Sequence, residues 1–366
     1  MIVLLLLSAG VCLLILRRVY KNLWSRNLSF HLDFDSPAVY AGGTAGILEV
    51  VENRKRLPIP LLEVYFRIQK GIQLPGVENV LTSDYIYKRD LFSLMGMESI
   101  TRTYKAGCPR RGCYSFSQMQ LTSRSLLLGS AYTCDSGSDK NLYVYAARTD
   151  VSDIMPVFES LFGEFQSSRK YYEDPFAFSG IRDYTLQDPM KTINWKASAR
   201  TGNLMVNTFS SVLSSQIMIY LDVSDRFLLK KEEQLEECIS VAATLSARLL
   251  GDGMEIGLSV NTPDGFYLPP AGGRQQLKTI EQFLTADFSA MQLPPFEEAL
   301  REIPEDTPFF PVFLSINADE ELKQSILGFL GREKQGLLIV PVESDSALSI
   351  DGAENLTIMN KRKNYN

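Results

Sequence analysis

The stretch Gln216-Ile217-Met218-Ile219-Tyr220-Leu221-Asp222-Val223 decides the fold class of the C-terminal half of the chain. This apolar run predicts a strand, and a helix is expected after it over residues 230–250. Gly251 and Gly253 are placed to end that helix. One helix face carries Leu235, Ile239, Ala242, Leu245 and Leu249. A strand that leads into an amphipathic helix indicates an α/β sheet covered by helices.

The same alternation continues toward the C-terminus. Further strands are predicted at residues 255–260, 310–316 and 337–342, and further helices at residues 274–284 and 319–330. Strands and helices that alternate in this way favour a mainly parallel, doubly wound sheet of the Rossmann type. We assign residues 181–345 to this domain and residues 346–366 to a C-terminal tail.

The chain on the N-terminal side of this domain has a different pattern. Residues 28–147 consist of short alternating runs separated by Gly, Pro, Asn and Asp, of which 44–51, 62–68 and 142–145 are the clearest strands. Several such strands at near-regular spacing predict an all-β, immunoglobulin-like sandwich. Residues 148–180 predict a helical linker, because a short helical stretch is followed there by a polar, aromatic run. A chain of 366 residues is long enough for two such globular units.

Residues 1–24 predict a membrane anchor. Residues 1–16 are all apolar or small and would span about 24 Å as a helix, which Tyr20 and Trp24 extend into the headgroup zone. Positive charges follow the apolar run, at Arg17, Arg18, Lys21 and Arg26. This order is opposite to that of a cleaved signal peptide, and the positive-inside rule places the later residues in the cytoplasm. We expect a single-pass inner-membrane protein with cytoplasmic C-terminal domains. A buried core helix and a sandwich outside the cell are the alternatives.

The composition excludes several classes of function. The net charge of -6 argues against a nucleic-acid partner, because nonspecific nucleic-acid binding needs a basic surface. The five cysteines are odd in number without zinc-type spacing, so they are interpreted as free thiols. The only histidine, His31, lies in an alternating stretch and is expected on the exposed face of a strand. With one histidine, the chain has almost no residues from which to build a Ser/His/Asp triad or a metal site with two histidine ligands.

The most specific motif is Ile181-Arg-Asp-Tyr-Thr-Leu-Gln-Asp-Pro-Met-Lys-Thr-Ile-Asn-Trp-Lys-Ala-Ser-Ala-Arg200. It resembles the signature of the bacterial family called domain of unknown function 58, which has Arg-x-Tyr, Gly-Asp, Arg-x-Ile-x-Trp and Ala-Arg. Matching positions are Arg182, Tyr184, Asp188, Ile193, Trp195, Ala199 and Arg200. Two positions depart from the pattern: Gln187 replaces the glycine, and Lys191 replaces an arginine. The resemblance implies a von Willebrand factor A-like domain and a MoxR-type AAA ATPase as partner.

Apart from the family resemblance, the signature predicts a short helix over residues 189–198. Asp188 is placed as its N-cap and Pro189 at its first position, with Met190 on a buried face. The cations and acids of the segment suggest a network of ion pairs and hydrogen bonds. Its members are the cations Arg182, Lys191, Lys196 and Arg200 among Asp183, Asp188 and Tyr184. The candidate binding or structural residues of the signature are Arg182, Tyr184, Asp188, Lys191, Trp195 and Arg200. We expect this network either to pin the linker against the last domain or to form a docking surface for a partner.

The resemblance also raises the question of a metal site. Von Willebrand factor A domains often hold Mg²⁺ through Asp-x-Ser-x-Ser at a strand end, because a hard cation prefers oxygen ligands. Asp222 and Ser224 match this pattern, but the third position is Arg226, which has no lone pair to donate. Asp225 is a weak substitute, and the distant aspartate is replaced by Asn317. We expect a degenerate site and assign no cofactor, with Mg²⁺ at Asp222 and Ser224 as the open alternative.

Two functions compete. The first is a non-enzymatic, membrane-anchored adaptor or scaffold that works with a MoxR-type AAA ATPase in cell-envelope or complex-assembly functions. No Walker-type phosphate loop occurs in the sequence, so ATP hydrolysis would come from the partner. The alternative is a hydrolase that uses Asp222, Asp183 or Asp188 as acid and base at the strand ends, which requires paired carboxylates with one raised pKa.

Overall fold

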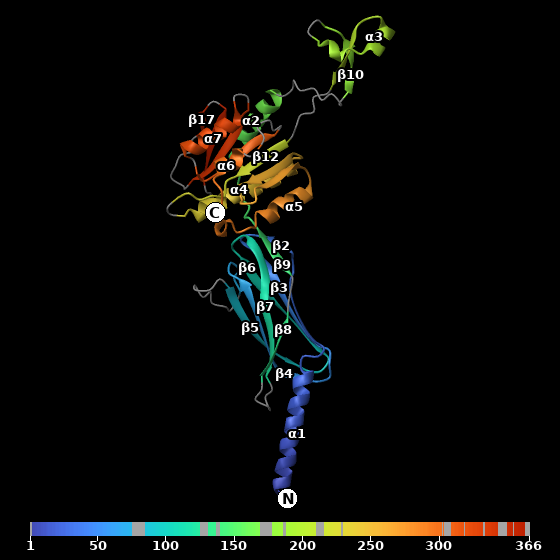
Figure 1. Cartoon of the computed structure of the whole chain (residues 1–366), viewed down its shortest axis with the longest axis vertical. Coiled ribbons are helices and arrows are strands. Elements are labelled where there is room, and N and C mark those ends of the chain that lie inside the picture. The colour runs from blue at the N-terminus through green and yellow to red at the C-terminus, as the bar shows by residue number, and fades with distance from the viewer. Residues whose placement is uncertain are drawn as a thin grey trace. The chain divides into compact units, whose positions relative to one another are not determined.

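The chain folds as two compact units (Figure 1). The computed structural model describes residues 2–74, 85–124, 131–136, 140–168, 178–185, 188–209, 216–227, 230–301, 303, 309–317, 319–331, 334–342, 350–353 and 355–362. Unit 1 comprises Met1–Ala147 with the segment Glu281–Asp287, and unit 2 comprises Arg148–Ile280 and Phe288–Asn366. The protein therefore has the multidomain, mixed α/β character that the sequence predicts.

Unit 1 is built mainly from two sheets. Its strands are β1 (Leu28–Phe34), β2 (Ala38–Tyr40), β3 (Gly43–Asn53), β4 (Ile59–Gln69), β5 (Tyr85–Leu94), β6 (Glu98–Cys108), β7 (Gly112–Arg124), β8 (Ala131–Ser136) and β9 (Asn141–Tyr145). One sheet has the order β1-β3-β6, and the other has the order β2-β9-β7-β4-β5 with β8 paired to β7. All pairs are antiparallel except β2 with β9.

The two sheets share one apolar core, because successive side chains of a strand point to opposite faces. Every second residue of β3 from Ala45 to Asn53 is buried, and Phe66 and Ile68 of β4 are buried from the other sheet. Phe34 of β1 stacks on Phe116 of β7 with the ring centroids 4.5 Å apart. Such aromatic contacts add to the stabilisation from burial alone.

The N-terminal helix α1 (Ile2–Leu23) ends against this core. Trp24 is only 3% exposed, and the Tyr20 hydroxyl lies 2.7 Å from Ser123 Oγ. The assignment of Trp24 to a headgroup zone is therefore wrong, because its indole packs near Tyr132 within the sandwich. Earlier in the helix, Leu14 and Leu16 are exposed. Among the residues that the structure describes, no helix is both long and apolar enough to cross a membrane.

A buried polar cluster interrupts the sandwich core. Glu49 of β3 is 0% exposed and accepts a hydrogen bond from the Tyr104 hydroxyl at 3.0 Å, while its Oε1 has no hydrogen-bond partner. Lys88 of β5 bonds to Asp90 at 2.8 Å and lies 4.0 Å from the centroid of the Tyr104 ring. Burial raises the pKa of Glu49 to about 7, and the Asp90 charge adds to the rise; Tyr104, Lys88 and Arg102 oppose it.

This raised pKa predicts a pH-dependent stability of the sandwich. The pKa of Glu49 is about 7 in the folded chain, against 4.5 for an unperturbed glutamate. Glu49 therefore binds more protons in the folded chain than in the unfolded chain. Its contribution to the unfolding free energy is fully present below pH 4.5 and is lost as the pH rises through 7. Glu49→Gln should match the wild type near pH 4.5 and exceed its unfolding free energy by at most about 3 kcal/mol at pH 8.

Urea denaturation followed by Trp24 fluorescence measures this difference. The chain has two tryptophans, so a Trp195→Phe background leaves Trp24 as the single reporter, and that residue is buried in the sandwich. An unfolding free energy of Glu49→Gln that differs from the wild type equally at both pH values would contradict the prediction.

From residue 148 onward, helices and strands alternate. The helices are α2 (Ile154–Ser168), η2 (Met190–Thr192), α3 (Trp195–Thr201), α4 (Glu232–Gly251), α5 (Arg274–Phe283), η3 (Phe288–Ala290), α6 (Phe296–Arg301) and α7 (Glu320–Leu330). The strands are β10 (Phe178–Asp183), β11 (Met205–Phe209), β12 (Gln216–Leu221), β13 (Glu255–Val260), β14 (Phe266–Ala271), β15 (Phe310–Leu314), β16 (Gly336–Val342), β17 (Ile350–Ala353) and β18 (Leu356–Arg362). The order in the large sheet is β14-β13-β12-β15-β16-β18-β17. The inner strands are parallel, and the edge strands β14 and β17 are antiparallel to their neighbours.

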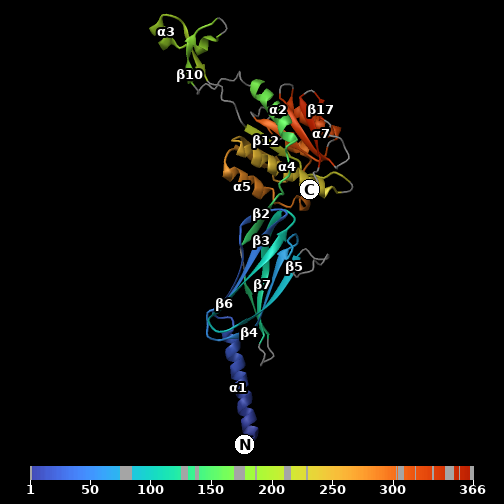
Figure 2. The ribbon, with the colours of Figure 1, turned by 180° about the vertical axis from the view of Figure 1, so that it is seen from behind.

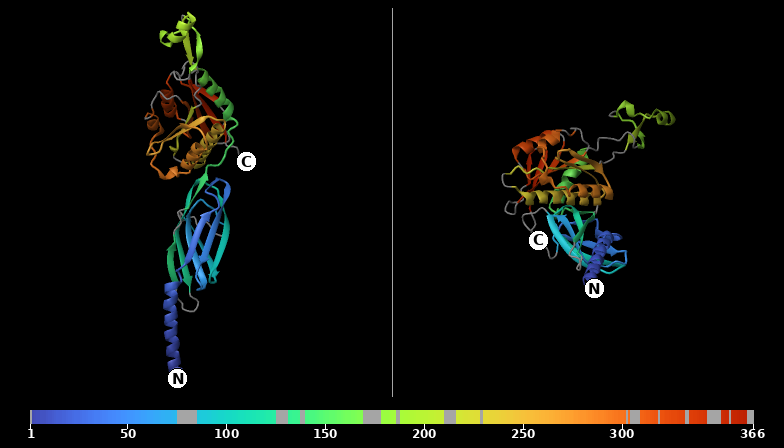
Figure 3. Two further views of the ribbon diagram at one scale, coloured as in Figure 1. Left: turned by 90° about the vertical axis from the view of Figure 1, so that its right-hand side faces the viewer. Right: turned by 60° about the horizontal axis from the view of Figure 1, so that its bottom comes forward.

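Helices cover both faces of this sheet (Figures 2 and 3). On one face, Tyr220 of β12 stacks on Phe313 of β15 at 5.2 Å and meets Phe329 of α7 edge-on. On the other face, Phe310 contacts the aromatic rings of α2, including Phe158 at 5.7 Å. A central strand buried on both sides explains why the run 217–221 shows no polar alternation.

The sheet extends beyond the domain boundary that the sequence predicts. Strands β17 and β18 fall in the region assigned to a tail, and β18 runs parallel to β16. The amino group of Lys361, in β18, is buried and lies 3.3 Å from Glu237 and 3.0 Å from the Thr149 hydroxyl. The charged Lys361 made β18 hard to recognise from the sequence. Its ion-pair partner, Glu237 of α4, is distant in sequence, so no local pattern indicates that this lysine is buried.

Candidate functional site

The first candidate site lies at the carboxyl end of β12, the central strand from which the parallel sheet extends in both directions. Such points are where open α/β sheets bind ligands, because the loops on either side diverge. Asp222 directly follows the strand and is fully buried. Its backbone N–H donates to the carbonyl of Leu314 at 2.8 Å, which holds it against β15. The sequence-predicted residue thus occupies the expected edge.

Five neutral donors surround the Asp222 carboxylate. Oδ1 accepts from the Ser224 amide at 2.9 Å, the Ser224 hydroxyl at 2.6 Å and Asn261 Nδ2 at 3.0 Å. Oδ2 accepts from the Ser315 hydroxyl at 2.7 Å and Asn317 Nδ2 at 2.9 Å. Hydrogen bonds to an ionised acceptor are stronger than neutral ones, so this ring compensates the burial of the charge.

Two asparagines join the neighbouring loops to this ring. Asn261 accepts from the Val223 amide at 2.9 Å and donates to the carbonyl of Pro294 at 3.1 Å. Asn317 donates to the carbonyl of Ser224 at 2.9 Å. Asn261 and Ser315 were not predicted from the sequence; their one available signal was a polar residue directly after a buried strand.

Arg226 lies beside this ring and binds two acids. Its guanidinium forms an ion pair with Glu297 of α6 and lies 3.5 Å from Asp319 Oδ2, before α7. Burial alone raises the pKa of Glu297, but hydrogen bonding and the charge of Arg226 more than offset this, so the pKa is lowered overall. Asp319 also caps α7 by accepting from the Leu322 amide at 2.9 Å. The guanidinium therefore connects three segments.

The residues at this strand end do not fit a divalent cation. Each oxygen of Asp222 already accepts at least two hydrogen bonds, and the Asn317 atom that faces it is an amide donor. Arg226 brings a positive charge, and Asp225 is used elsewhere, accepting from the Phe227 and Lys231 amides at 3.0 and 2.6 Å. Within the described ranges, no group of three or more His, Cys, Asp or Glu residues is placed to hold a metal.

A cavity of about 700 Å³ opens next to the ring. Ser224, Arg226 and Glu297 form part of its polar wall. Apolar lining residues include Leu235, Phe288, Met291, Leu293, Pro294 and Pro295. Concave sites that combine an apolar lining with a few polar groups are typical of ligand binding.

The ring predicts a specific cost for Asp222→Asn. An amide presents two N–H donors where the carboxylate presents only acceptors, so two of the five donors lose their partner. We expect a loss of about 2–4 kcal/mol in the unfolding free energy of unit 2. Urea denaturation followed by circular dichroism measures it, with the exposed Asp264→Asn as the control. Equal effects of the two variants would contradict the ring as a stabilising element.

The second candidate site is the signature segment, which folds around the antiparallel pair of β10 and β11. The helix predicted over residues 189–198 is wrong. Residues 190–192 form a single 3-10 turn, and α3 begins at Trp195 with Asn194 as its N-cap. The helix is interrupted because Ile193 is extended and forms a bridge with Val206, which buries both side chains.

Arg182 and Asp188 hold the signature together. The two Arg182 nitrogens donate to the two carboxylate oxygens at 2.7 and 2.6 Å, a bidentate ion pair. Asp188 also accepts from the Thr185 amide and hydroxyl, each at 2.8 Å, and so it is not the predicted N-cap. These bonds from Arg182 and Thr185 hold the pKa of Asp188 well below its usual range. Gln187 lies outside the described residues.

The other candidate residues of the signature do not join this pair. The Tyr184 amide donates to the carbonyl of Leu204 at 2.9 Å, which places it in the hairpin. The side chains of Lys191, Trp195 and Arg200 are exposed and form no hydrogen bond or ion pair with other described residues. The network is therefore smaller than predicted.

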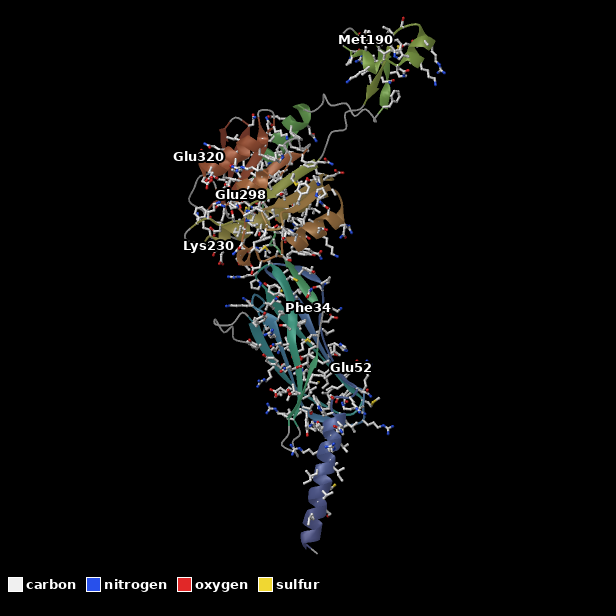
Figure 4. All side chains as sticks on the ribbon, viewed as in Figure 1. Phe34, Glu52, Met190, Lys230, Glu298 and Glu320 are labelled. Carbon is white, nitrogen blue, oxygen red and sulfur yellow. The ribbon has the colours of Figure 1, made fainter. Side chains whose placement is uncertain are left out.

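Several apolar and basic side chains of the signature are exposed. Trp195 is 67% exposed, and Met190, predicted to be buried, is 76% exposed (Figure 4). Leu204 is also exposed. Lys191, Lys196 and Arg200 are exposed in the same segment. Trp and Arg are among the residue types most enriched at the positions that dominate binding energy in protein interfaces.

The ion pair predicts which aspartate orders the signature. Asp188→Ala removes the acceptor of Arg182 and Thr185, so amide hydrogen exchange at Thr185 and along β10–β11 should accelerate. Asp183→Ala, an exposed aspartate in the same hairpin, should leave the exchange unchanged. Mass spectrometry of exchanged peptides from residues 178–209 tests both. Equal acceleration in the two variants would show that the ion pair does not order the hairpin.

The remaining sequence candidates lie apart from these sites. His31 is exposed on β1, as predicted. The five cysteines, all within the described part of the chain, are free thiols. Burial raises the pKa of both Cys108 and Cys113. A raised pKa disfavours the reactive thiolate at both positions.

Comparison with known proteins identifies the signature segment. Residues 180–303 match the family model for Protein of unknown function DUF58. The Uncharacterized protein YeaD of Bacillus subtilis (strain 168) is 24% identical over 253 residues, which cover 69% of this chain and 61% of YeaD. The match thus spans less than two thirds of the length of that relative.

Solved structures show only distant likeness. The CARDB domain of the PF1109 protein from Pyrococcus furiosus, solved in complex with di-metal ions, is 15% identical with a TM-score of 0.21, over 32% of this chain and 90% of that one. A beta-glucosidase from Listeria innocua, solved in complex with gluconolactone, is 12% identical with a TM-score of 0.17, over 32% and 16%. Scores of this size have no bearing on the activity of this chain.

Proposed function

This chain belongs to the DUF58 family, and we propose that it is a membrane-attached, non-enzymatic adaptor whose signature segment docks a MoxR-type AAA ATPase. The observation that carries the proposal is the exposed Trp195, flanked by exposed cations on a segment braced by the Arg182–Asp188 pair. A large aromatic side chain that the fold leaves in water adds nothing to folding stability, and it gains burial free energy when a partner covers it.

The geometry of the signature supports docking. Only Ile193 and Val206 have buried apolar side chains within the described part of the hairpin and α3. The segment is held instead by polar contacts such as Arg182 with Asp188, and Asn194 with Asn207 at 2.7 Å. Bracing of this kind keeps the exposed side chains in place before binding, which lowers the entropic cost of association.

The large sheet supports a von Willebrand factor A-like domain. When β17 is left out and the other six strands are numbered from β12 in chain order, the sheet has the strand order 3-2-1-4-5-6. This is the arrangement of doubly wound folds, here with the third strand, β14, antiparallel to its neighbour. Asp222 and Ser224 stand at the end of the first strand, where the domains of that class place ligands.

Attachment to the inner membrane is assigned to α1. Its described side chains between Leu7 and Val19 include seven exposed large apolar residues, and no acidic residue occurs in the helix. Exposed apolar side chains on a helix gain free energy when lipid removes them from water. The cations that follow the apolar run favour a cytoplasmic position for the later domains.

The hydrolase remains the competing function, and it needs two carboxylates that share one site. Asp188 is bonded to Arg182, Asp222 accepts five hydrogen bonds from neutral groups, and Asp183 lies on β10. These surroundings favour the binding function, since Arg182 and Thr185 hold the pKa of Asp188 low and the oxygens of Asp222 are taken up by hydrogen bonds within the fold.

The docking proposal predicts the loss of one partner on substitution of the signature face. The full chain, purified in detergent from its native cells, should recover a MoxR-type AAA ATPase identified by mass spectrometry. Trp195→Ala and Met190→Ala should each reduce that recovery at least about tenfold, as for residues central to an interface. Met95→Ala is the matched control, because Met95 is 70% exposed in the sandwich, close to the 76% of Met190.

The other outcomes each weigh against the proposal. Recovery of the ATPase that is equal in all variants would place docking elsewhere on the chain. Recovery of no ATPase with the wild type would remove the partner and bring the hydrolase forward. Circular dichroism of each variant establishes that the fold is retained before the comparison is made.

A further inference from the structure

We infer that Arg226 takes the place of a divalent cation at the end of β12, so that this end of the domain is held by the chain's own guanidinium and works without metal. The role of Arg226 concerns how the strand end is assembled and does not depend on the identity of any partner. It is supported by the position of Arg226 in the motif, by its contacts and by the charges around it.

The position of Arg226 is the first step. Asp222, Ser224 and residue 226 have the spacing of an Asp-x-Ser-x-Ser motif, in which the last serine supplies an oxygen to the ion. A guanidinium at that point has five N–H donors and no lone pair. Arg226 lines the same cavity as Ser224, so its side chain stays at the strand end.

The contacts of Arg226 are the second step. A cation at the end of β12 would draw together oxygen ligands from separate loops. Arg226 does the same: it binds Glu297 at the start of α6 and Asp319 at the start of α7. The loop after β12, α6 and α7 are thus joined through one positive charge. A planar guanidinium suits this role, because it bonds several carboxylates at once.

The balance of charge is the third step. Asp222 is 0% exposed and Glu297 is 7% exposed, and buried carboxylates require compensation. The direct partners of Asp222 are hydroxyl, amide and backbone groups, all of them neutral. Arg226 bonds Glu297 directly, and the negative charge of Asp222 also contributes to the raised pKa of Arg226. A second cation at this end would meet the repulsion of the guanidinium.

Two residues near Arg226 and Asp222 have an unused oxygen. Glu297, which bonds Arg226, and Asn317, which bonds Asp222, each have one buried side-chain oxygen without a hydrogen-bond partner among the described residues. Both are oxygen acceptors of the kind that hard cations bind. Replacement of Arg226 by a small hydroxyl residue would remove the repulsive charge, restore the spacing of the motif and leave these acceptors available.

The experiment is a metal titration of the full chain in detergent. The melting temperature, Tm, is measured in EDTA and in rising MgCl₂ or MnCl₂ for the wild type, Arg226→Ser and Arg226→Lys. We expect the wild type and Arg226→Lys not to respond to metal. Arg226→Ser should melt lower in EDTA and recover about 3–5 °C with a saturating dependence on Mg²⁺. Arg226→Ala lacks the hydroxyl ligand and should melt low without recovery.

Metal binding to the wild type provides a test that needs no variant to fold. Isothermal titration with MnCl₂ should show no saturable heat for the wild-type chain. Saturable Mn²⁺ binding by the wild-type chain would overturn the inference. The inference would also fail if Arg226→Ser melted at the wild-type temperature and ignored metal, since Arg226 would then hold nothing together. Neither result bears on docking of the ATPase, which is measured at Trp195.

Discussion

The carboxylate of Asp222 is the constraint on which the α/β domain depends. A negative charge that is completely removed from water at the end of the central strand must be stabilised by its surroundings. Ser224, Asn261, Ser315 and Asn317 meet this demand, and each comes from a chain segment that directly follows β12, β13 or β15. Asp222 therefore links the ends of three strands whose backbones the sheet already pairs, and the loops that line the cavity begin at this link.

Carboxylates are held differently in three of the polar centres that the structure describes. Five neutral donors surround the buried Asp222. At Asp188, a bidentate arginine and two bonds from Thr185 hold the pKa well below its usual range. Glu49 has one donor, and burial raises its pKa to about 7. The sandwich therefore contains a group that titrates near neutral pH, because burial and the Asp90 charge outweigh its single hydrogen bond.

The signature and the strand end also divide two tasks. Arg226, Glu297 and Asp319 close the strand end with internal ion pairs, so its polar groups are largely consumed by the fold. The signature uses few of its side chains to hold itself together and leaves Trp195, Met190 and several cations in water. An adaptor needs such a division, because one region must be stable by itself and another must gain stability from a partner.

The sequence by itself determined the alternation of elements and the place of Asp222. Apolar runs such as 217–221 and 310–314 show their strands through burial on both faces, a local property of the side chains. The resemblance of the signature likewise marked Arg182 and Asp188, which form its ion pair. The expected helix over residues 189–198 was wrong, because Ile193 is extended and forms a bridge with Val206, a partner 13 residues away that no local pattern indicates.

Only the tertiary structure decided the contacts between residues distant in sequence. Asn261 and Ser315 entered the Asp222 ring because parallel strands bring their carboxyl ends together, which no local pattern reveals. The burial of Trp24 and the strand that contains Lys361 depended in the same way on partners such as Tyr132 and Glu237. Periodicity reports whether a side chain faces inward, whereas the partner that it meets there is set by the path of the whole chain.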